Sequence, residues 1–192
     1  MSPEKKGELP TGYIWRECSS IKAKFPMPQD WFFKAETAPG TQGFFMTREP
    51  IHGESFIKQL GEVSLKTTRP EGYLKTGLAI NVLPDFYRRT KRSPAAVARN
   101  FMNNPPKEMM PTSQFTRFKD GPLITLRRFF RSEALIVMGR KMDPTNYYIE
   151  FTAKELTGTM YNILFETPSE KWQEDAAIAR IMIENRVLDK SL

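Results

Sequence analysis

Two alternating segments near the C-terminal end, joined by a glycine turn, constrain the fold of this 192-residue chain more than any other feature. Between residues 147 and 154, apolar and polar side chains alternate with a period of two, which is typical of a strand with one buried face. Gly158 marks the turn and residues 161–165 repeat the alternation, so the segments predict an antiparallel hairpin. We expect the apolar side chains of both strands to share one face: Tyr147, Ile149, Phe151 and Ala153 on the first strand, and Tyr161, Ile163 and Phe165 on the second.

Two helices are predicted from the residues at their starts. Residues 167–170 read Thr-Pro-Ser-Glu, a capping box in which the Thr and Glu side chains would bind free amides of the first turn. An apolar stripe at helical spacing follows and predicts a helix running to about residue 188. The Ser-Pro pair at 93–94 predicts a second helix, because Ser accepts from free amides and Pro suits the first helical position. Two asparagines and two prolines at 103–106 end it.

Shorter alternating or apolar stretches predict the remaining strands. They cover residues 13–15, 21–25, 31–34, 43–47, 77–83, 114–118 and 123–126, and Pro26 and Pro28 are expected to stop the second of them. Many antiparallel strands, one helix in the middle and one long helix at the end make the chain α+β. We expect residues 1–11 to be a disordered lead-in and residues 12–192 to form a single domain with an irregular insertion at about 50–76.

One cysteine and one histidine exclude several classes of site. A single Cys excludes an intramolecular disulfide and a multi-thiolate zinc or iron–sulfur centre, and a single His excludes a two-His metal centre. The glycine motifs of dinucleotide and phosphate binding are absent, and no spacing of carboxylates indicates acid–base chemistry. We therefore expect no catalytic residue, no metal and no cofactor. His52 is interpreted as an ordinary loop residue and Cys18 as a small buried apolar residue.

A formal net charge of +7 makes the cationic residues the first candidates for binding. Arg88, Arg89, Lys91 and Arg92 place four cations within five residues, directly before the predicted helix at 93–94. This loop is either a solvated surface feature or a contact for phosphate or an acidic partner, which the helix N-terminus would favour. We expect all four side chains to be exposed, mostly unpaired with carboxylates, and to bind the partner.

Two further clusters have alternative interpretations. Met109 and Met110 lie in a proline-bounded loop, where they either form an adaptable contact surface or pack down on the sheet. Arg127, Arg128 and Arg131 surround two phenylalanines, and alternation would point Arg128 away from the other two. We interpret this stretch as an edge strand protected by its charges.

Three stretches at the joints between predicted elements resemble the PsbP-like family, whose fold is shared by the extrinsic photosystem protein PsbP and the Ran-binding import factor Mog. They read Phe-Pro-Met-Pro-Gln-Asp-Trp at 25–31, Tyr-Tyr-Ile-Glu-Phe at 147–151, and an apolar strand leading into Thr-Pro-Ser-Glu-Lys-Trp at 167–172. The resemblance implies a central antiparallel sheet with helices on both faces. It also implies a protein that docks to a larger assembly, since the family has no shared reaction.

The sequence therefore favours a non-catalytic accessory domain that binds an acidic protein surface. The alternative is a START-like carrier of a hydrophobic ligand, which would need an apolar cavity of several hundred Å3. An enzyme without a local motif and a nucleic-acid binder are less favoured, and the oligomeric state stays open. No apolar window of about 18 residues exists, so no membrane span is expected. The chain as given favours the cytoplasm, and an exported periplasmic or thylakoid-lumen protein is the alternative if a leader has been trimmed.

Overall fold

The computed structural model describes residues 9–19, 23–50, 76–133, 135–137, 140–154 and 158–188. Most of the expected lead-in (residues 1–8), most of the expected insertion (residues 51–75) and His52 lie outside the described residues.

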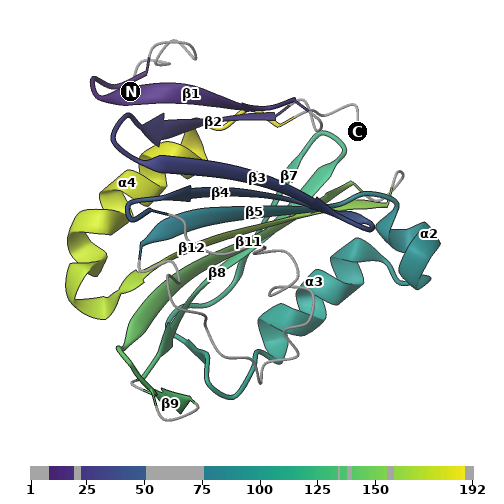
Figure 1. Cartoon of the computed structure of the whole chain (residues 1–192). Helices are drawn as coiled ribbons and strands as arrows, with labels where there is room; N and C mark the ends of the chain where they lie inside the picture. Colours follow the sequence, from purple (N-terminus) through teal and green to yellow (C-terminus); the bar gives the residue numbers. More distant parts are fainter. Residues whose placement is uncertain are drawn as a thin grey trace.

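An eight-stranded antiparallel sheet forms the centre of the molecule (Figure 1). Its strand order is β3-β4-β5-β12-β11-β8-β6, and β7 also pairs with β8. The strands are β3 (Phe32–Ala38), β4 (Thr41–Thr47), β5 (Gly77–Leu83), β6 (Met110–Pro111), β7 (Thr116–Asp120), β8 (Leu123–Ser132), β11 (Thr145–Lys154) and β12 (Thr159–Pro168). Because β6 and β7 both pair with its outer side, β8 is not an edge strand, and the expectation of an edge at the three arginines is wrong.

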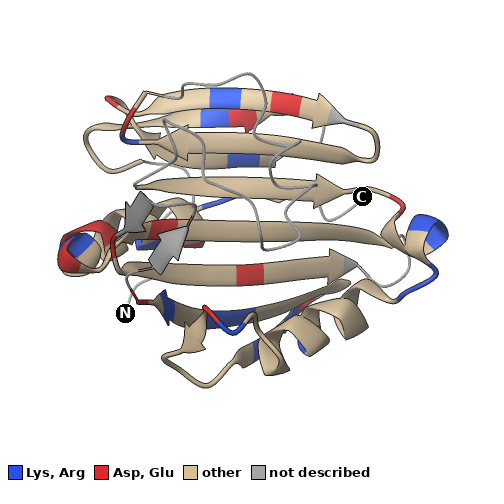
Figure 2. Ribbon diagram, turned by 60° about the horizontal axis from the view of Figure 1, so that its bottom comes forward, with Lys and Arg blue, Asp and Glu red and all other residues tan. Residues whose placement is uncertain are grey.

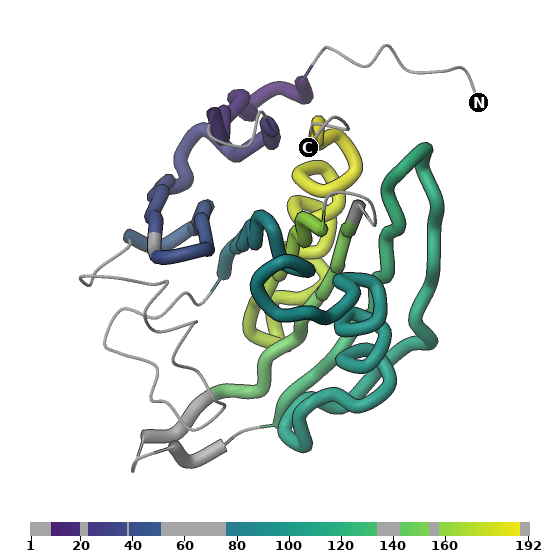
Figure 3. Tube along the Cα trace, turned by 90° about the vertical axis from the view of Figure 1, so that its right-hand side faces the viewer, coloured from purple at the N-terminus to yellow at the C-terminus, as the bar shows by residue number. Residues whose placement is uncertain are grey.

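Helices cover both faces of this sheet, so the α+β class and the layered arrangement are confirmed. One face carries α4 (Trp172–Glu184) and a separate two-stranded ribbon of β1 (Tyr13–Cys18) and β2 (Ala23–Pro28). The other face carries α3 (Pro94–Asn103) and the short α2 (Phe86–Thr90). The chain after α4 reaches the ribbon, where the Lys24 and Val187 backbones exchange two hydrogen bonds of 2.9 Å (Figure 3).

Each face has its own apolar core. The first core lies under α4 and the ribbon and includes Phe25, Met46, Ile80, Phe165 and Met182, all fully buried. The second core lies under α3 and includes Ala98, Met102, Leu126, Phe130 and Ile149. The ribbon tolerates Pro26 and Pro28 inside β2, against expectation, because a two-stranded ribbon is not flanked by strands on both sides.

The hairpin of β11 and β12 forms as predicted, but its register differs from the expected one. Tyr161 lies opposite Thr152 and Phe165 lies opposite Tyr148, so the apolar residues of β12 face the first core. The apolar residues Ile149 and Phe151 of β11 face the second core. A shift of one residue moves a whole strand pattern to the opposite face, and this is the difference between the expected register and the observed one.

Both predicted helices form, but only one of the two predicted helix starts is correct. Ser93 caps α3 as expected, with its Oγ accepting from Ala96 N at 3.4 Å. The predicted capping box is wrong, because Thr167 lies in β12 and the 3-10 turn η2 (Ser169–Lys171) precedes α4. The N-cap of α4 is Lys171, which makes no side-chain cap. The remaining elements, β9 (Leu135–Val137) and β10 (Arg140–Met142), come after β8 and before β11 in the sequence and pair with each other in a small ribbon.

Candidate functional site

The four cations singled out in the sequence lie at one end of the sheet, on and directly after α2 (Figure 2). Arg88, Arg89, Lys91 and Arg92 are all exposed, as expected, and the neighbouring Tyr87 is 56% exposed. We call these five residues the basic corner. The sequence prediction placed the cations in a loop and missed α2 itself, which is only five residues long.

Tight backbone geometry holds the basic corner in place. Asp85 and Lys91 adopt left-handed conformations at φ 51° and 58°, and they bracket α2 on either side. The Thr90 hydroxyl donates to the Phe86 carbonyl at 2.8 Å and accepts from the Arg92 amide at 3.2 Å. Phe86 is buried in the second core and anchors the helix there.

Two hairpin turns support the basic corner from below. Gly158, in the turn between β11 and β12, has a φ of 67°, and a Cβ there would lie 3.0 Å from the Cβ of Tyr87, so this position favours glycine. The Arg89 guanidinium donates to the carbonyl of Gly40 in the β3–β4 turn and also to the Pro84 carbonyl. Arg89 therefore joins α2 to the sheet.

The remaining cations of the basic corner have no carboxylate partner among the described residues. The side chains of Arg88, Lys91 and Arg92 also make no described hydrogen bond, and Arg89 binds only backbone carbonyls. The N-terminus of the ten-residue α3 lies directly after Arg92, and its dipole adds to the same positive field. Whether this surface binds a partner stays a prediction.

The methionine pair is divided between the two interpretations. Met109 packs against the second core, whereas Met110 lies in β6 and is 44% exposed. Arg128 points to the α3 face, where its Nε donates to the Ser113 carbonyl at 2.8 Å. Arg127 lies on the α4 face with its guanidinium 4.3 Å from the Phe118 ring centroid, so the expected divergence of Arg127 and Arg128 is correct.

Three carboxylates are buried among the described residues, those of Glu150, Glu166 and Asp175, and the sequence analysis missed them. Glu150, 1% exposed on β11, accepts from Tyr148 Oη at 2.5 Å and from Thr152 Oγ1 at 3.0 Å, and pairs with Arg186 beyond α4. Burial and the Glu150 carboxylate raise the pKa of the Tyr148 phenol well above its usual value. The only sequence signal was that Glu150 is a polar residue on the mixed face of the alternating strand. That both faces of this strand are covered is seen in the structure.

Asp175 is a further buried carboxylate and is fully buried on α4. It accepts from Thr167 of β12 and from Thr76 Oγ1 at 3.3 Å, and pairs with Arg48. Arg48 directly follows β4 and Thr76 directly precedes β5, and the Arg48 N–H donates to the Thr76 carbonyl at 3.1 Å. Asp175 therefore joins α4 to three separate parts of the chain. We interpret both carboxylate clusters as structural.

Cys18 is fully buried, as expected, and burial raises its pKa from 9.0 to about 12. Since the thiolate is the nucleophile, we expect the native protein at pH 8 to react with iodoacetamide about 1,000-fold more slowly than the urea-unfolded chain. Mass spectrometry of timed samples measures both rates. Equal rates in the two states would contradict the buried position of this thiol.

The described residues contain no group of three or more His, Cys, Asp or Glu side chains that could hold a metal ion. No helix among the described residues is long and apolar enough to span a membrane.

Three solved structures share this arrangement of sheet and helices. Cyanobacterial PsbP (CyanoP) from Synechocystis sp. PCC 6803 matches with a TM-score of 0.51 and 9% identity, over 97% of this chain and 98% of that one. LpqN, involved in cell envelope biogenesis of Mycobacterium tuberculosis, matches with 0.51 and 10%, over 92% and 90%. The Ran-binding protein Mog1p of Saccharomyces cerevisiae matches with 0.50 and 9%, over 93% and 96%.

The chain has the PsbP-like fold. The resemblance found at three joints of the sequence is thereby confirmed at the level of fold. No protein-family model matches the sequence, and no curated protein matches it either. At these identities the likeness establishes the PsbP-like fold alone, so the basic corner is a feature of this chain and is not transferred from the relatives.

Proposed function

We propose that this chain is a non-catalytic protein-docking domain that binds an acidic protein surface through its basic corner. The observation that carries the proposal is the group of exposed cations around Tyr87 that have no carboxylate partner among the described residues. Surplus charge of one sign on a rigid surface steers a partner of opposite charge. Exposed Tyr and Arg side chains are also the residue types that contribute most to protein interfaces.

The PsbP-like fold agrees with this proposal. One structural neighbour, Mog1p, is a Ran-binding protein, so a chain of this fold can have a protein partner. That partner is not carried over to this chain, because the likeness is one of fold. What supports a protein partner here is the way the basic corner is held: it rests on two hairpin turns through Tyr87 and Arg89, and Phe86 anchors it in the core.

Charge reversal tests the proposal directly. Arg88→Glu combined with Arg92→Glu should slow association with the partner at least about tenfold at low salt and leave the free energy of unfolding within about 0.5 kcal/mol. The measurement is surface plasmon resonance with the partner recovered by affinity capture on the unmodified chain. Arg89 is left unchanged because it holds the β3–β4 turn.

A matched control exists on the far edge of the sheet. Arg117 and Lys119 are exposed on β7, and Arg117→Glu with Lys119→Glu makes the same change in net charge. Equal slowing in both double variants would assign the effect to net charge and overturn the proposed site. Binding of single-stranded RNA that is lost only in the Arg88 and Arg92 variant would assign the basic corner to nucleic acid instead.

A further inference from the structure

Among the described residues, α4 and the chain after it cover the α4 face of the sheet over β12 and β11 but leave much of β8 uncovered. On β11 the side chains of Tyr148, Glu150 and Thr152 are buried on this face. Their β8 neighbours are Phe129, Arg127 and Thr125, of which Phe129 is 38% exposed and the other two are half-buried. The open strip therefore lies over β8, at the border of the area that α4 covers.

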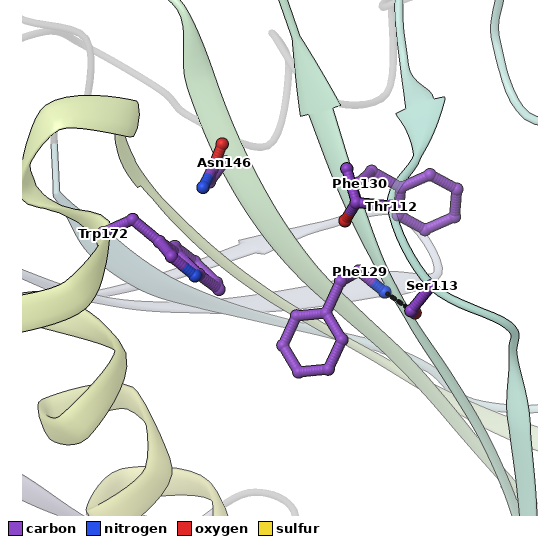
Figure 4. A pocket seen from close by; sticks show the side chains of 6 residues that line it. All are labelled: Thr112, Ser113, Phe129, Phe130, Asn146 and Trp172. Carbon is purple, nitrogen blue, oxygen red and sulfur yellow. Dashed lines mark hydrogen bonds between the residues drawn. The ribbon is translucent and has the colours of Figure 1, made fainter.

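A pocket of about 230 Å3 lies in this strip, beside the first residue of α4 (Figure 4). Its lining residues come from three elements and the chain after β6: Thr112, Ser113, Phe129, Phe130, Asn146 and Trp172. Ligand pockets for small molecules usually measure about 300–1,000 Å3. This aromatic pocket is therefore of a size for one side chain of a partner.

The aromatic walls are held rigidly before any partner arrives. The Phe129 ring lies edge-to-face on Tyr148 at 5.3 Å and on Trp172 at 5.9 Å between ring centroids. The Phe129 amide donates to Ser113 Oγ at 3.1 Å, which fixes the backbone on the outer side. A preorganised aromatic wall costs little conformational entropy when it binds.

The polar groups around the aromatic pocket offer donors. Asn146 Oδ1 accepts from Ser169 Oγ at 2.8 Å, which leaves the Asn146 amide hydrogens without a partner among the described residues. The Trp172 indole N–H also has no described acceptor. Ser113 Oγ is already engaged, since it accepts from Phe129 and donates to the Gln114 carbonyl. An occupant of the aromatic pocket must therefore supply acceptors.

Two arginines flank Phe129 on the same face of β8, at the second position on either side. Arg131 pairs with Glu133 at 3.3 Å, but both side chains are about half exposed, so this pair is weak. Arg127 lies over Phe118, and its Nε donates to Thr116 Oγ1 at 3.2 Å. The carboxylate facing Arg127 is Glu150, which is already paired with Arg186. Both flanking charges can therefore attract carboxylates of a partner.

We infer that the aromatic pocket binds a short acidic protein segment, which packs one apolar side chain against the Phe129 and Trp172 rings that line the pocket and places carboxylates at Arg127 and Arg131. The donors of Asn146 and Trp172 bind the carbonyl groups of that segment. A nucleic acid fits less well, because Phe129 and Trp172 are in contact at an interplanar angle of 83° and leave no parallel slot for a base. This site is separate from the basic corner and does not depend on it.

The test uses the full chain and four capped pentapeptides, Glu-Glu-X-Glu-Glu, with Trp, Phe, Leu or Ala at X. We expect the Trp, Phe or Leu peptides to shift the NMR signals of the Trp172 indole N–H and the Asn146 side-chain amide, and the Ala peptide to bind at least about fivefold more weakly. Arg127→Glu combined with Arg131→Glu should weaken binding at least about tenfold. Arg117→Glu, on the other face of the same hairpin, should leave it unchanged.

Each other result overturns the inference. Absence of shifts with all four peptides would contradict binding of an acidic segment at this pocket. Equal binding by Lys-Lys-Trp-Lys-Lys would contradict it as well. If oligouridylate shifts the same signals more strongly than the peptides, the ligand of the pocket is a nucleic acid and not an acidic protein segment. Variants of the basic corner should leave these shifts unchanged, so this test and that of the proposed function fail independently. Thermal melts of each variant check that the fold is retained.

Discussion

Replacing Arg186 with methionine should lower the free energy of unfolding by about 3 kcal/mol, although the residue lies beyond the last helix. Arg186 pairs with Glu150, and its guanidinium also donates to the Ile183 carbonyl. Without the cation, Glu150 would be a buried charge bound only by the hydroxyls of Tyr148 and Thr152. Urea unfolding at pH 7 measures the loss.

A double variant separates this charge effect from packing. Adding Glu150→Gln to Arg186→Met removes the stranded charge, so the pair should lose less stability than Arg186→Met alone. Arg180→Met is the matched control, because Arg180 is 74% exposed and pairs with Glu184 on the surface of α4; it should cost under about 0.5 kcal/mol. A cost below about 1 kcal/mol for Arg186→Met would contradict the buried pair.

Asp175→Ala should have a comparable effect, about 3 kcal/mol, because it leaves three donors without their shared acceptor. Arg48, Thr76 and Thr167 all bind this carboxylate. For a chain of this length, a loss of that size corresponds to a fall in Tm of roughly 6–12 °C, which scanning calorimetry measures. The largest part should come from the Arg48 side chain, which loses its described charge partner.

Glu174→Ala is the control for Asp175→Ala. Glu174 is the preceding residue in the first turn of α4 but is exposed. It should change the unfolding free energy by less than about 0.5 kcal/mol. Equal costs at the two positions would mean that Asp175 acts through helix-end electrostatics, and the network joining α4 to β4, β5 and β12 would then have no stabilising role.

Local patterns predicted the elements whose signals do not depend on distant contacts. Gly77–Leu83 was predicted as a central strand from its apolar composition, and Ser93 as a helix cap from its local bonding. The register of β11 on β12 could not be obtained this way, because a shift of one residue changes the face that a strand presents but leaves the alternation along the chain unchanged. The Thr-Pro-Ser-Glu box failed for a related reason, since the Thr167 hydroxyl donates to the Asp175 carboxylate and is not the cap of α4.

Of the candidate sites, too, one could be predicted from the sequence and the other could not. The cations of the basic corner follow from composition along the chain, so their exposure could be predicted. The aromatic pocket brings Trp172 of α4 beside Phe129 of β8, residues more than forty positions apart. Only the tertiary arrangement places them together, and no spacing in the sequence indicates it. The same holds for Glu150 and Arg186.

The position of β12 in the sheet order has a consequence for synthesis on the ribosome. β12 is the last strand of the sheet in sequence, yet it lies between β5 and β11 and joins the N-terminal strands β3-β4-β5 to the strands β11-β8-β6. Until residues 159–168 emerge, β5 has an unpaired and apolar edge, and the first core lacks Phe165 and the residues of α4. Completion of the sheet must therefore wait for nearly the whole chain, and the nascent N-terminal strands are the part most exposed to aggregation and to capture by chaperones.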